Sequence, residues 1–222
     1  MTSSSTAPYP MPGAASPPAD GPPGGIIDPR RSVLVVQHVQ KYLLHALRDS
    51  APVGELLGNI DRLTRSARSV GVPVVYAVRI PGQRARQAEV AGGARHALLE
   101  PPAEAEARAV ADVVRPQAGD IVFTAKQYSA FVGTRLRARL TELGRDQLVV
   151  VGAAARTEVL LTAAEAWMQD LDPFVVGDAV VDRTAGDHEM AVRWLAATCA
   201  TVATTDAVLE AFRGGRADAA AV

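Results

Sequence analysis

Apolar residues in the central part of the chain recur with two different periods. Three short runs, Ile121–Thr124, Gln147–Gly152 and Pro173–Gly177, are almost continuously apolar, which is typical of strands buried on both faces of a sheet. Between them, about Val132–Leu143 and Thr157–Asp170 carry apolar residues at helical spacing. This alternation predicts a β–α–β–α–β unit, whose strands must be parallel because each helix returns the chain to the same end of the sheet.

The same two periods predict further elements on either side of this region. The strands are Ser32–Val36, Pro73–Val78 and Ala200–Thr204, and the helices are Val53–Val70, Ala103–Val114, about Gly186–Thr198 and Thr205–Phe212. Right-handed crossovers between six such strands favour a doubly wound sheet of order 3-2-1-4-5-6. The predicted fold class is therefore α/β, with a mainly parallel six-stranded sheet and helices on both faces.

Composition divides the chain into three parts. Residues 1–27 are rich in Pro, Ser, Ala and Gly and show no periodicity, as in a disordered tail. Residues 28–213 hold the predicted strands and helices and make one domain of ordinary size, and residues 214–222 are expected to fray. Within the domain, residues 79–102 contain several Gly and Pro residues and are predicted to form a long loop, a feature that often serves as a lid.

Charge and cysteine content exclude several classes of function. The 23 basic and 24 acidic residues are interspersed, with a net charge of −1, so neither nucleic acid nor an anionic membrane is an expected partner. The sequence has no apolar run long enough to span a bilayer and no signal-peptide pattern at its start. The single cysteine, Cys199, cannot form an intrachain disulfide, which fits a cytoplasmic protein. Cys199 is expected to be a small buried hydrophobe rather than a nucleophile.

Ligands of parallel α/β sheets bind at the carboxyl ends of the strands, near the point where strand order reverses. Thr124–Phe131, Ala153–Glu158 and Asp178–Asp182 follow predicted strands and fall at such ends. The turns lack a G-x-G-x-x-G pattern, so no dinucleotide site is predicted. We expect a small-molecule substrate and no cofactor.

Several motifs resemble the isochorismatase-like (cysteine hydrolase) superfamily, in particular its phenazine-type and siderophore-type isochorismatases. They are YSAF at 128–131, GRDQLVVVG at 144–152, TAAEAWMQDLDPFVVGDAVVD at 162–182, TTDAVLE at 204–210 and, upstream, DPRRSVLVVQHVQKYLL at 28–44. The resemblance implies a homodimer paired through the helices after the fourth and fifth strands, where Trp167, Met168 and Trp194 would supply apolar contact; they would otherwise be core residues. It also offers a second interpretation of the N-terminal segment, as an arm along the body that contains Tyr9, Pro10 and Pro12.

Relatives that form covalent intermediates use an Asp after the first strand, a Lys before the YSAF-like motif and a Cys that opens the helix after the fourth strand. In vinyl-ether-cleaving relatives Gly replaces this Cys, and the Asp is the general acid. Aligned by these motifs, the three positions hold His38, Ala125 and Glu158, and a lysine follows one residue later at Lys126. The resemblance therefore predicts neither thiolate chemistry nor simple isochorismatase activity, and the carboxylate of Glu158 would crowd any oxyanion formed nearby.

His38 and Glu158 are the predicted catalytic residues. If the fold is as predicted, their side chains face one cavity from the ends of neighbouring strands. A carboxylate stabilises a neighbouring imidazolium and fixes its tautomer, so the pair suits general acid/base chemistry near neutral pH. The alternative is a structural ion pair that fills an abandoned pocket.

Six further residues are predicted to contact the substrate: Gln37, Arg79, Lys126, Tyr128, Ala154 and Arg156. Arg79 stands where relatives have a substrate-contacting Gln and suits a carboxylate or phosphate, or it is a solvated loop arginine. Tyr128 matches a family tyrosine that borders the substrate, or it packs under the lid.

The other predicted contacts are less direct. Lys126 stands one residue after the family's Lys position, and such a slip turns a strand-end side chain to the opposite face of the sheet. Its side chain would therefore have to bend back to reach the substrate. Ala154 widens the pocket, and Arg156 contacts the substrate or pairs with Glu158. Loop arginines at 84, 86 and 95 have weaker claims.

No metal site is predicted. Nicotinamidase-type relatives hold a metal through Asp and His after the second strand, but here that region reads RIPGQRARQ. His45 and His96 are isolated. Asp178, Asp182 and His188 resemble the family's D-A-x-x-D…H signature and are expected to cap helices and turns.

Three functions are consistent with the sequence. The first is an enzyme that acts without a covalent intermediate on a small anionic metabolite of natural-product biosynthesis. Its reaction would be vinyl-ether hydrolysis, elimination, isomerisation or cyclisation, among which the sequence does not choose. The second is a catalytically silent binding or scaffolding protein. The third, conventional isochorismatase activity, has the least support because the inherited catalytic residues are absent.

Overall fold

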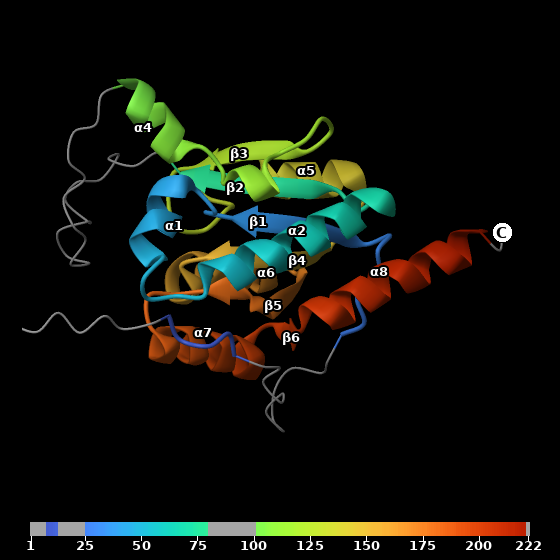
Figure 1. Ribbon diagram of the computed structural model, residues 1–222. Helices are drawn as coiled ribbons and strands as arrows, with labels where there is room; N and C mark the ends of the chain where they lie inside the picture. Colours follow the sequence, from blue (N-terminus) through green and yellow to red (C-terminus); the bar gives the residue numbers. More distant parts are fainter. Residues whose placement is uncertain (1–7, 13–24, 80–100, 221–222) are drawn as a thin grey trace, which may run out of the picture.

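The computed structural model describes residues 8–12, 25–79 and 101–220. Their centre is a parallel sheet in the order β3-β2-β1-β4-β5-β6 (Figure 1), which confirms the predicted fold class and strand order. The strands are β1 (Ser32–Gln37), β2 (Val74–Arg79), β3 (Ile121–Ala125), β4 (Gln147–Ala153), β5 (Asp172–Val181) and β6 (Thr201–Ala203).

Helices cover both faces of this sheet. They are α1 (Lys41–Leu47), α2 (Val53–Ser69), α4 (Pro101–Arg108), the 3-10 turn η1 (Asp112–Val114), α5 (Leu136–Leu143), the π-helical turn η2 (Ala155–Val159), α6 (Leu160–Met168), α7 (Ala185–Thr198) and α8 (Thr205–Ala220). The last of these runs well past the Phe212 end predicted from its periodicity.

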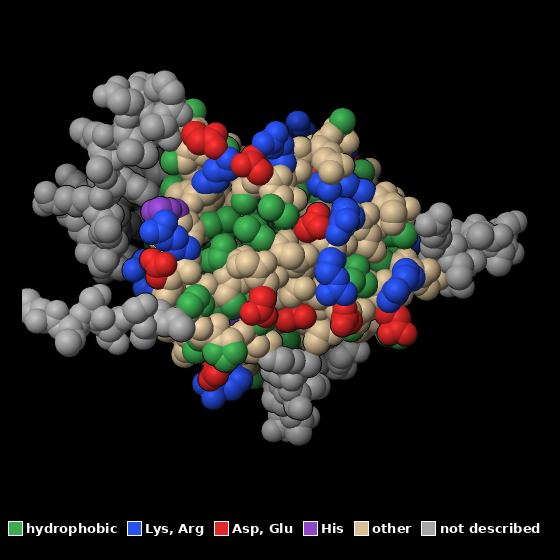
Figure 2. Space-filling view, in the orientation of Figure 1, with side chains coloured by type: hydrophobic (Ala, Val, Ile, Leu, Met, Phe, Trp, Pro, Cys, Tyr) green, Lys and Arg blue, Asp and Glu red, His purple; other side chains and the backbone are tan. Residues whose placement is uncertain are grey.

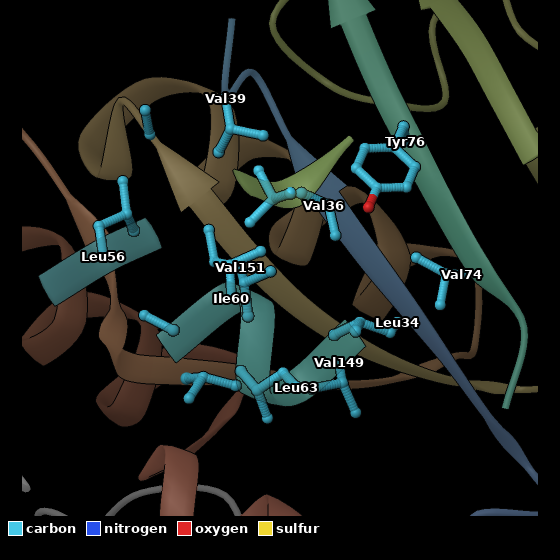
Figure 3. Packing of buried hydrophobic residues seen from close by; sticks show 14 of the residues in the cluster. Leu34, Val36, Val39, Leu56, Ile60, Leu63, Val74, Tyr76, Val149 and Val151 are labelled. Atoms are coloured by element: carbon cyan, nitrogen blue, oxygen red, sulfur yellow. The ribbon is translucent and has the colours of Figure 1, made fainter. Parts of the chain in front are cut away.

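Two apolar cores form because successive strand residues point to opposite faces. Leu34 and Val36 of β1 pack with Ile60 of α2 and Phe212 of α8, and Figure 3 shows part of this cluster between α2 and the sheet. On the other face, residues of β1 and β4 pack against α5, α6 and α7. The near-continuous apolar runs of the sequence follow from this burial on both sides.

Local boundaries differ from the prediction where tertiary hydrogen bonds replace helical ones. The single helix predicted over Ala103–Val114 is wrong, because α4 ends at Arg108 and η1 begins only at Asp112. Between them the backbone bonds to the segment after β1: the amide of Lys41 donates to Ala109 O at 2.9 Å, and Ala111 donates to Val39 O at 3.0 Å. Helix α1, which the periodicity did not predict, begins at Lys41 and is therefore held by the first of these hydrogen bonds.

Gly152 is required where β4 approaches β1 most closely. Its φ is 135°, and a Cβ atom placed there would lie 1.9 Å from the carbonyl oxygen of Gln37. The register of β4 with β5 also shifts at this point, between Val150 and Gly152. Glycine thereby lets the end of β4 reach the residues that follow β1.

Residues 8–12 lie along the body of the domain. The Tyr9 hydroxyl accepts a hydrogen bond from the amide of Asp182 at 3.1 Å and lies 3.1 Å from Nδ1 of His188. Tyr9 and Met11 also pack on the α2-side core. The rest of the 1–27 segment, most of the 79–102 loop with its arginines 84, 86 and 95, and His96 lie outside the described residues.

On the face drawn in Figure 2, both acidic and basic side chains surround a central apolar area, in keeping with a net charge of −1. No helix in the described part of the chain is both long and apolar enough to cross a lipid bilayer.

Candidate functional site

Three ionisable side chains meet at the carboxyl ends of adjacent strands. His38 follows β1, Arg79 is the last residue of β2, and Glu158 lies in η2, directly after β4. Strand β1 pairs with both β2 and β4, and its register sets Gln37 opposite Gly152. The three residues come together because the central strands end side by side, at the edge where ligands of such sheets bind.

His38 and Glu158 are in direct contact and nearly closed to solvent. Nδ1 of His38 lies 2.7 Å from Oε1 of Glu158, and the two residues are 5% and 2% exposed. The distance is that of an ion pair, but Nδ1 has no partner that meets hydrogen-bond geometry. The ring is therefore held by its close contact with the carboxylate and by packing, without an aligned hydrogen bond at Nδ1.

Arg79 binds the same carboxylate oxygen. Its Nη1 lies 2.7 Å from Glu158 Oε1, and its guanidinium carbon lies 4.9 Å from the centre of the Tyr128 ring, within the range of a cation–π contact. The side chain is 25% exposed. Because a guanidinium carries five N–H donors, Arg79 keeps donors for a second anion while it holds Glu158.

Gln40 fixes the backbone of Arg79. Its side-chain oxygen accepts from the Arg79 amide at 2.7 Å, and its side-chain nitrogen donates to the carbonyl oxygens of Arg79 at 2.9 Å and Arg108 at 2.7 Å. One buried amide thus ties the end of β2 to the end of α4. This role of Gln40 was not predicted from the sequence. The only available signal was its position three residues after Gln37, a predicted site residue.

Tyr42 is the other member of the site that sequence patterns did not identify. Its hydroxyl contacts Nε2 of His38, and the two ring centres are 5.4 Å apart. Burial raises the pKa of Tyr42, as does the negative charge of Glu158, against the opposing charges of Arg79 and Arg108. The phenol therefore stays protonated at neutral pH. Its position four residues after His38 was the available signal.

Unusual backbone conformations occur on both sides of this cluster. His38 has a φ of 53°, and Ala154, directly before η2, has a φ of 61°. A third non-glycine residue with positive φ among the described residues, Asp170, follows the last turn of α6, a common place for such a residue. Strain of about 1 kcal/mol or more at each of the first two positions, together with a π-helical turn, is typical of functional sites.

Gln37 and Tyr128 adjoin the cluster. The side-chain nitrogen of Gln37 donates to the carbonyl oxygen of Tyr128 at 2.8 Å, which fixes the amide orientation and holds the Tyr128 loop against β1. The Gln37 side-chain oxygen is buried without a hydrogen-bond partner among the described residues. Since buried acceptors are rarely left unpaired, this oxygen is a candidate for accepting a hydrogen bond from a ligand.

Lys126, Arg156 and Ala154 are placed differently. Lys126 is exposed, and its aliphatic carbons lie over Gly133. Arg156 is also exposed and pairs with Asp187 at 3.0 Å instead of with Glu158. Ala154 is half-buried and accepts the Glu158 amide at 2.8 Å through its carbonyl oxygen, so it shapes the turn that presents the carboxylate.

The D-A-x-x-D…H residues organise turns. Asp178 accepts from the backbone and hydroxyl of Thr205 at the start of α8, at 2.7 and 2.9 Å. Asp182 accepts from the Arg156 amide at 2.8 Å, and His188 lies 3.0 Å from the carbonyl oxygen of Gly177. No group of three or more His, Cys, Asp or Glu side chains in the described ranges is arranged to hold a metal ion.

Cys199 lies away from this site, between α7 and β6, and is buried. Burial raises the pKa of its thiol to about 11, so it is protonated at neutral pH and unsuited to nucleophilic attack. His45 is exposed on α1, where its Nδ1 lies 3.1 Å from Nη1 of Arg48.

An isochorismatase domain model matches residues 32–207 of this chain. The phenazine biosynthesis protein PhzD of Pseudomonas fluorescens is 37% identical over 185 residues, which cover 82% of this chain and 87% of the relative. An isochorismatase of Bacillus subtilis is 35% identical over 216 residues, covering 95% and 67%. Enterobactin synthase component B of Escherichia coli is 30% identical over 189 residues, covering 83% and 64%.

Solved structures show the same fold at lower identity. A cysteine hydrolase from Pseudomonas syringae superposes with a TM-score of 0.73 at 19% identity, covering 92% of this chain and 98% of that one. N-carbamoylsarcosine amidase from Thermoplasma acidophilum superposes with a TM-score of 0.64 at 27% identity, covering 79% and 97%.

Proposed function

Because this chain belongs to the isochorismatase domain family, we propose that it is an enzyme that performs general acid/base chemistry on a small anionic metabolite, without a covalent intermediate. The observation that carries the proposal is the buried cluster of His38, Glu158 and Arg79 at the carboxyl ends of β1, β2 and β4. Such a cluster combines a proton-transferring group, a charge that stabilises its protonated form, and an anion-binding group.

A non-covalent reaction follows from the chemistry of the residues at hand. Aligned by motif, His38, Ala125 and Glu158 occupy the positions of the family's Asp, Lys and nucleophile, so the site is rebuilt. The one thiol, Cys199, is buried elsewhere. The carboxylate of Glu158 would repel an oxyanion formed beside it, which argues against acyl-enzyme chemistry. The proposed acid/base reaction also needs no cofactor.

The substrate class is inferred from Arg79 and from the relatives. An arginine with spare donors suits a carboxylate, and relatives are named for isochorismatase activity and for phenazine and enterobactin biosynthesis. We propose a cyclic carboxylate of natural-product biosynthesis, acted on in the cytoplasm by vinyl-ether hydrolysis, elimination, isomerisation or cyclisation. Lys126 and Arg156 are assigned to the periphery of this site, and Gln37, Tyr128 and Ala154 to its wall.

A second candidate is a catalytically silent binding or scaffolding protein. The close burial of His38 and Glu158, at 5% and 2% exposure, favours it, because a sealed ion pair performs no chemistry. The two candidates differ in what His38 does: a structural His38 sustains stability, whereas a catalytic one sustains turnover.

The test is incubation of purified protein with isochorismate and with chorismate, followed by NMR of the products. Turnover by wild type that is lost in His38→Asn, with little change in thermal stability, is the expected result. Asn is chosen because it adopts a positive φ readily. Turnover of neither compound, with a large loss of stability in His38→Asn, would instead support the silent protein. Release of pyruvate from isochorismate at an undiminished rate in His38→Asn would contradict the assigned role of His38.

We also propose a homodimer paired through the outer surfaces of α6 and α7. Large apolar side chains are exposed there, with Trp167 53%, Met168 69% and Trp194 41% accessible. They are not core residues, and apolar area of this kind is commonly covered by a partner.

A further inference from the structure

The imidazole of His38 is held between two polar groups. Nδ1 faces the Glu158 carboxylate at 2.7 Å, and Nε2 contacts the hydroxyl of Tyr42. A carboxylate only accepts hydrogen bonds, so the proton of a neutral imidazole belongs on Nδ1, and Nε2 becomes an acceptor. The Tyr42 hydroxyl is then the donor. The three side chains form a chain of polar contacts with one direction, from Tyr42 through His38 to Glu158.

The three side chains become less buried from Glu158 through His38 to Tyr42. Glu158 is 2% exposed and His38 5%, whereas Tyr42, on the first turn of α1, is only half-buried. Both ring nitrogens of His38 are already engaged within the protein. Of the three side chains, Tyr42 is therefore the most accessible to a substrate that approaches from solvent.

We propose that Tyr42 is the acid/base residue that contacts the substrate, and that His38 relays its proton while Glu158 stabilises the charged ring. The proposal rests on the proposed function. As a base, the Tyr42 oxygen takes a proton from a C–H or O–H bond of the substrate while its own proton moves to Nε2 of His38. The electron pair of the broken bond stays on the substrate, and the product is an imidazolium beside the Glu158 carboxylate. As an acid, the same steps run in reverse.

The surroundings of Tyr42 explain why it needs such a relay. Burial and the charge of Glu158 raise its pKa, and the charges of Arg79 and Arg108 only partly offset them. A free phenolate is therefore unfavourable at neutral pH. Passing the proton to His38 as another arrives keeps Tyr42 neutral throughout, and Arg79 lies 2.7 Å from the Glu158 carboxylate oxygen that faces the imidazolium.

The physical part of the proposal is tested without a substrate, by ¹⁵N NMR of the imidazoles in wild type, Tyr42→Phe and Tyr76→Phe. The His38 signals are assigned by their loss in His38→Asn. Wild type should show the Nδ1-protonated tautomer at neutral pH, and Tyr42→Phe should change the Nε2 shift and the tautomer population. Tyr76→Phe is the matched control, because it also removes a partly buried hydroxyl contact, 3.1 Å from Nη2 of Arg68, that involves neither His38 nor Glu158. Identical His38 signals in wild type and Tyr42→Phe would overturn the relay.

The catalytic part is tested with isochorismate and chorismate. Tyr42→Phe should lower kcat by about 10²- to 10⁴-fold with little change in KM, and Tyr42→Phe/His38→Asn should be no slower than either single variant, because residues of one relay are not additive. Tyr76→Phe should keep wild-type kcat. Wild-type kcat in Tyr42→Phe would overturn the inference alone, whereas a wild-type protein that converts neither compound would contradict the proposed function and the catalytic relay together.

Discussion

Oε1 of Glu158 lies 2.7 Å from Nδ1 of His38 and 2.7 Å from Nη1 of Arg79. One carboxylate oxygen is thus shared by an imidazole and a guanidinium that come from two other elements of the fold. A buried carboxylate with two such neighbours is electrostatically satisfied, and removing either neighbour changes the balance. Substitutions of either neighbour therefore separate the structural and chemical consequences of this arrangement.

The Arg79–Glu158 pair should matter to stability only when one partner is missing. Arg79→Met removes the guanidinium from a buried carboxylate, and we expect it to lower the free energy of unfolding by about 3 kcal/mol. Glu158→Leu should cost less, because Arg79 is partly solvated and can turn outward. The double variant Arg79→Met/Glu158→Leu should regain most of the loss, since apolar replacements of a buried pair are often neutral, while any turnover remains abolished.

Urea unfolding of the four proteins measures this coupling. Arg139→Ala is the control, because its pair with Glu142 is exposed at 42% and 48% and should contribute less than about 1 kcal/mol. Strict additivity of the two site substitutions would show that the pair is not coupled.

Gly152→Ala should destabilise the protein by at least about 2 kcal/mol. The new Cβ would lie 1.9 Å from the backbone oxygen of Gln37, at a φ of 135°, and β4 would have to move away from β1. Gly58→Ala is the matched control: it lies within α2 with nothing within 4 Å of the added Cβ, so it should stabilise by about 0.5–1 kcal/mol. Equal melting temperatures for Gly152→Ala and wild type would refute the close-approach argument.

His188 should make the fold weaker in mild acid. Its pKa is lowered, mainly because burial disfavours the charged ring, although the Gly177 carbonyl and the charges of Asp182 and Glu189 oppose this. Below its ordinary pKa of 6.5, the unfolded chain binds a proton that the folded protein does not. The free energy of unfolding therefore falls, by at most about 1.4 kcal/mol per pH unit, as the pH drops from about 6.5 toward the pKa of His188 in the folded protein. Below that pKa it levels off.

Denaturant unfolding at several pH values between 7.5 and 5 measures this slope in wild type and in His188→Gln. The variant should be less stable at pH 7.5 and should have a shallower slope than wild type in this range. Parallel curves for the two proteins would mean that another group causes the pH dependence.

Trp167→Glu and Trp194→Glu should shift the protein toward monomer in sedimentation experiments, because a charge on the exposed α6–α7 surface disfavours its burial against a second copy. Val113→Glu, at an exposed valine of η1 (61% accessible), should leave the oligomeric state unchanged. A monomeric wild type at micromolar concentration would refute the homodimer.

The strand order could be derived from sequence because burial on both faces leaves a strong local record. Runs such as Leu148–Val151 are apolar at every position, and the chirality of crossovers then leaves few topologies. Boundaries were less predictable where distant backbone groups compete for hydrogen bonds, as at Ala109–Ala111, whose partners lie around Gln40.

The site was only partly accessible to sequence reasoning. His38 and Glu158 follow strands that must end together, so their convergence could be expected from topology alone. The shared oxygen with Arg79, the clamp formed by Gln40 and the contact of Tyr42 with Nε2 depend on side-chain directions. The backbone around them includes positive φ angles at His38 and Ala154, which no periodicity encodes. The outward turn of Arg156 likewise depends on Asp187, far along the chain.

The order of apolar and polar residues by itself determined the sheet, its two cores and the edge at which chemistry is possible, because burial is a local and additive property of each segment. Only the tertiary structure decided which polar groups touch at that edge. Hydrogen bonds and ion pairs act over about 3 Å and depend on angle, so a single backbone dihedral decides whether an imidazole meets a carboxylate, a phenol or both.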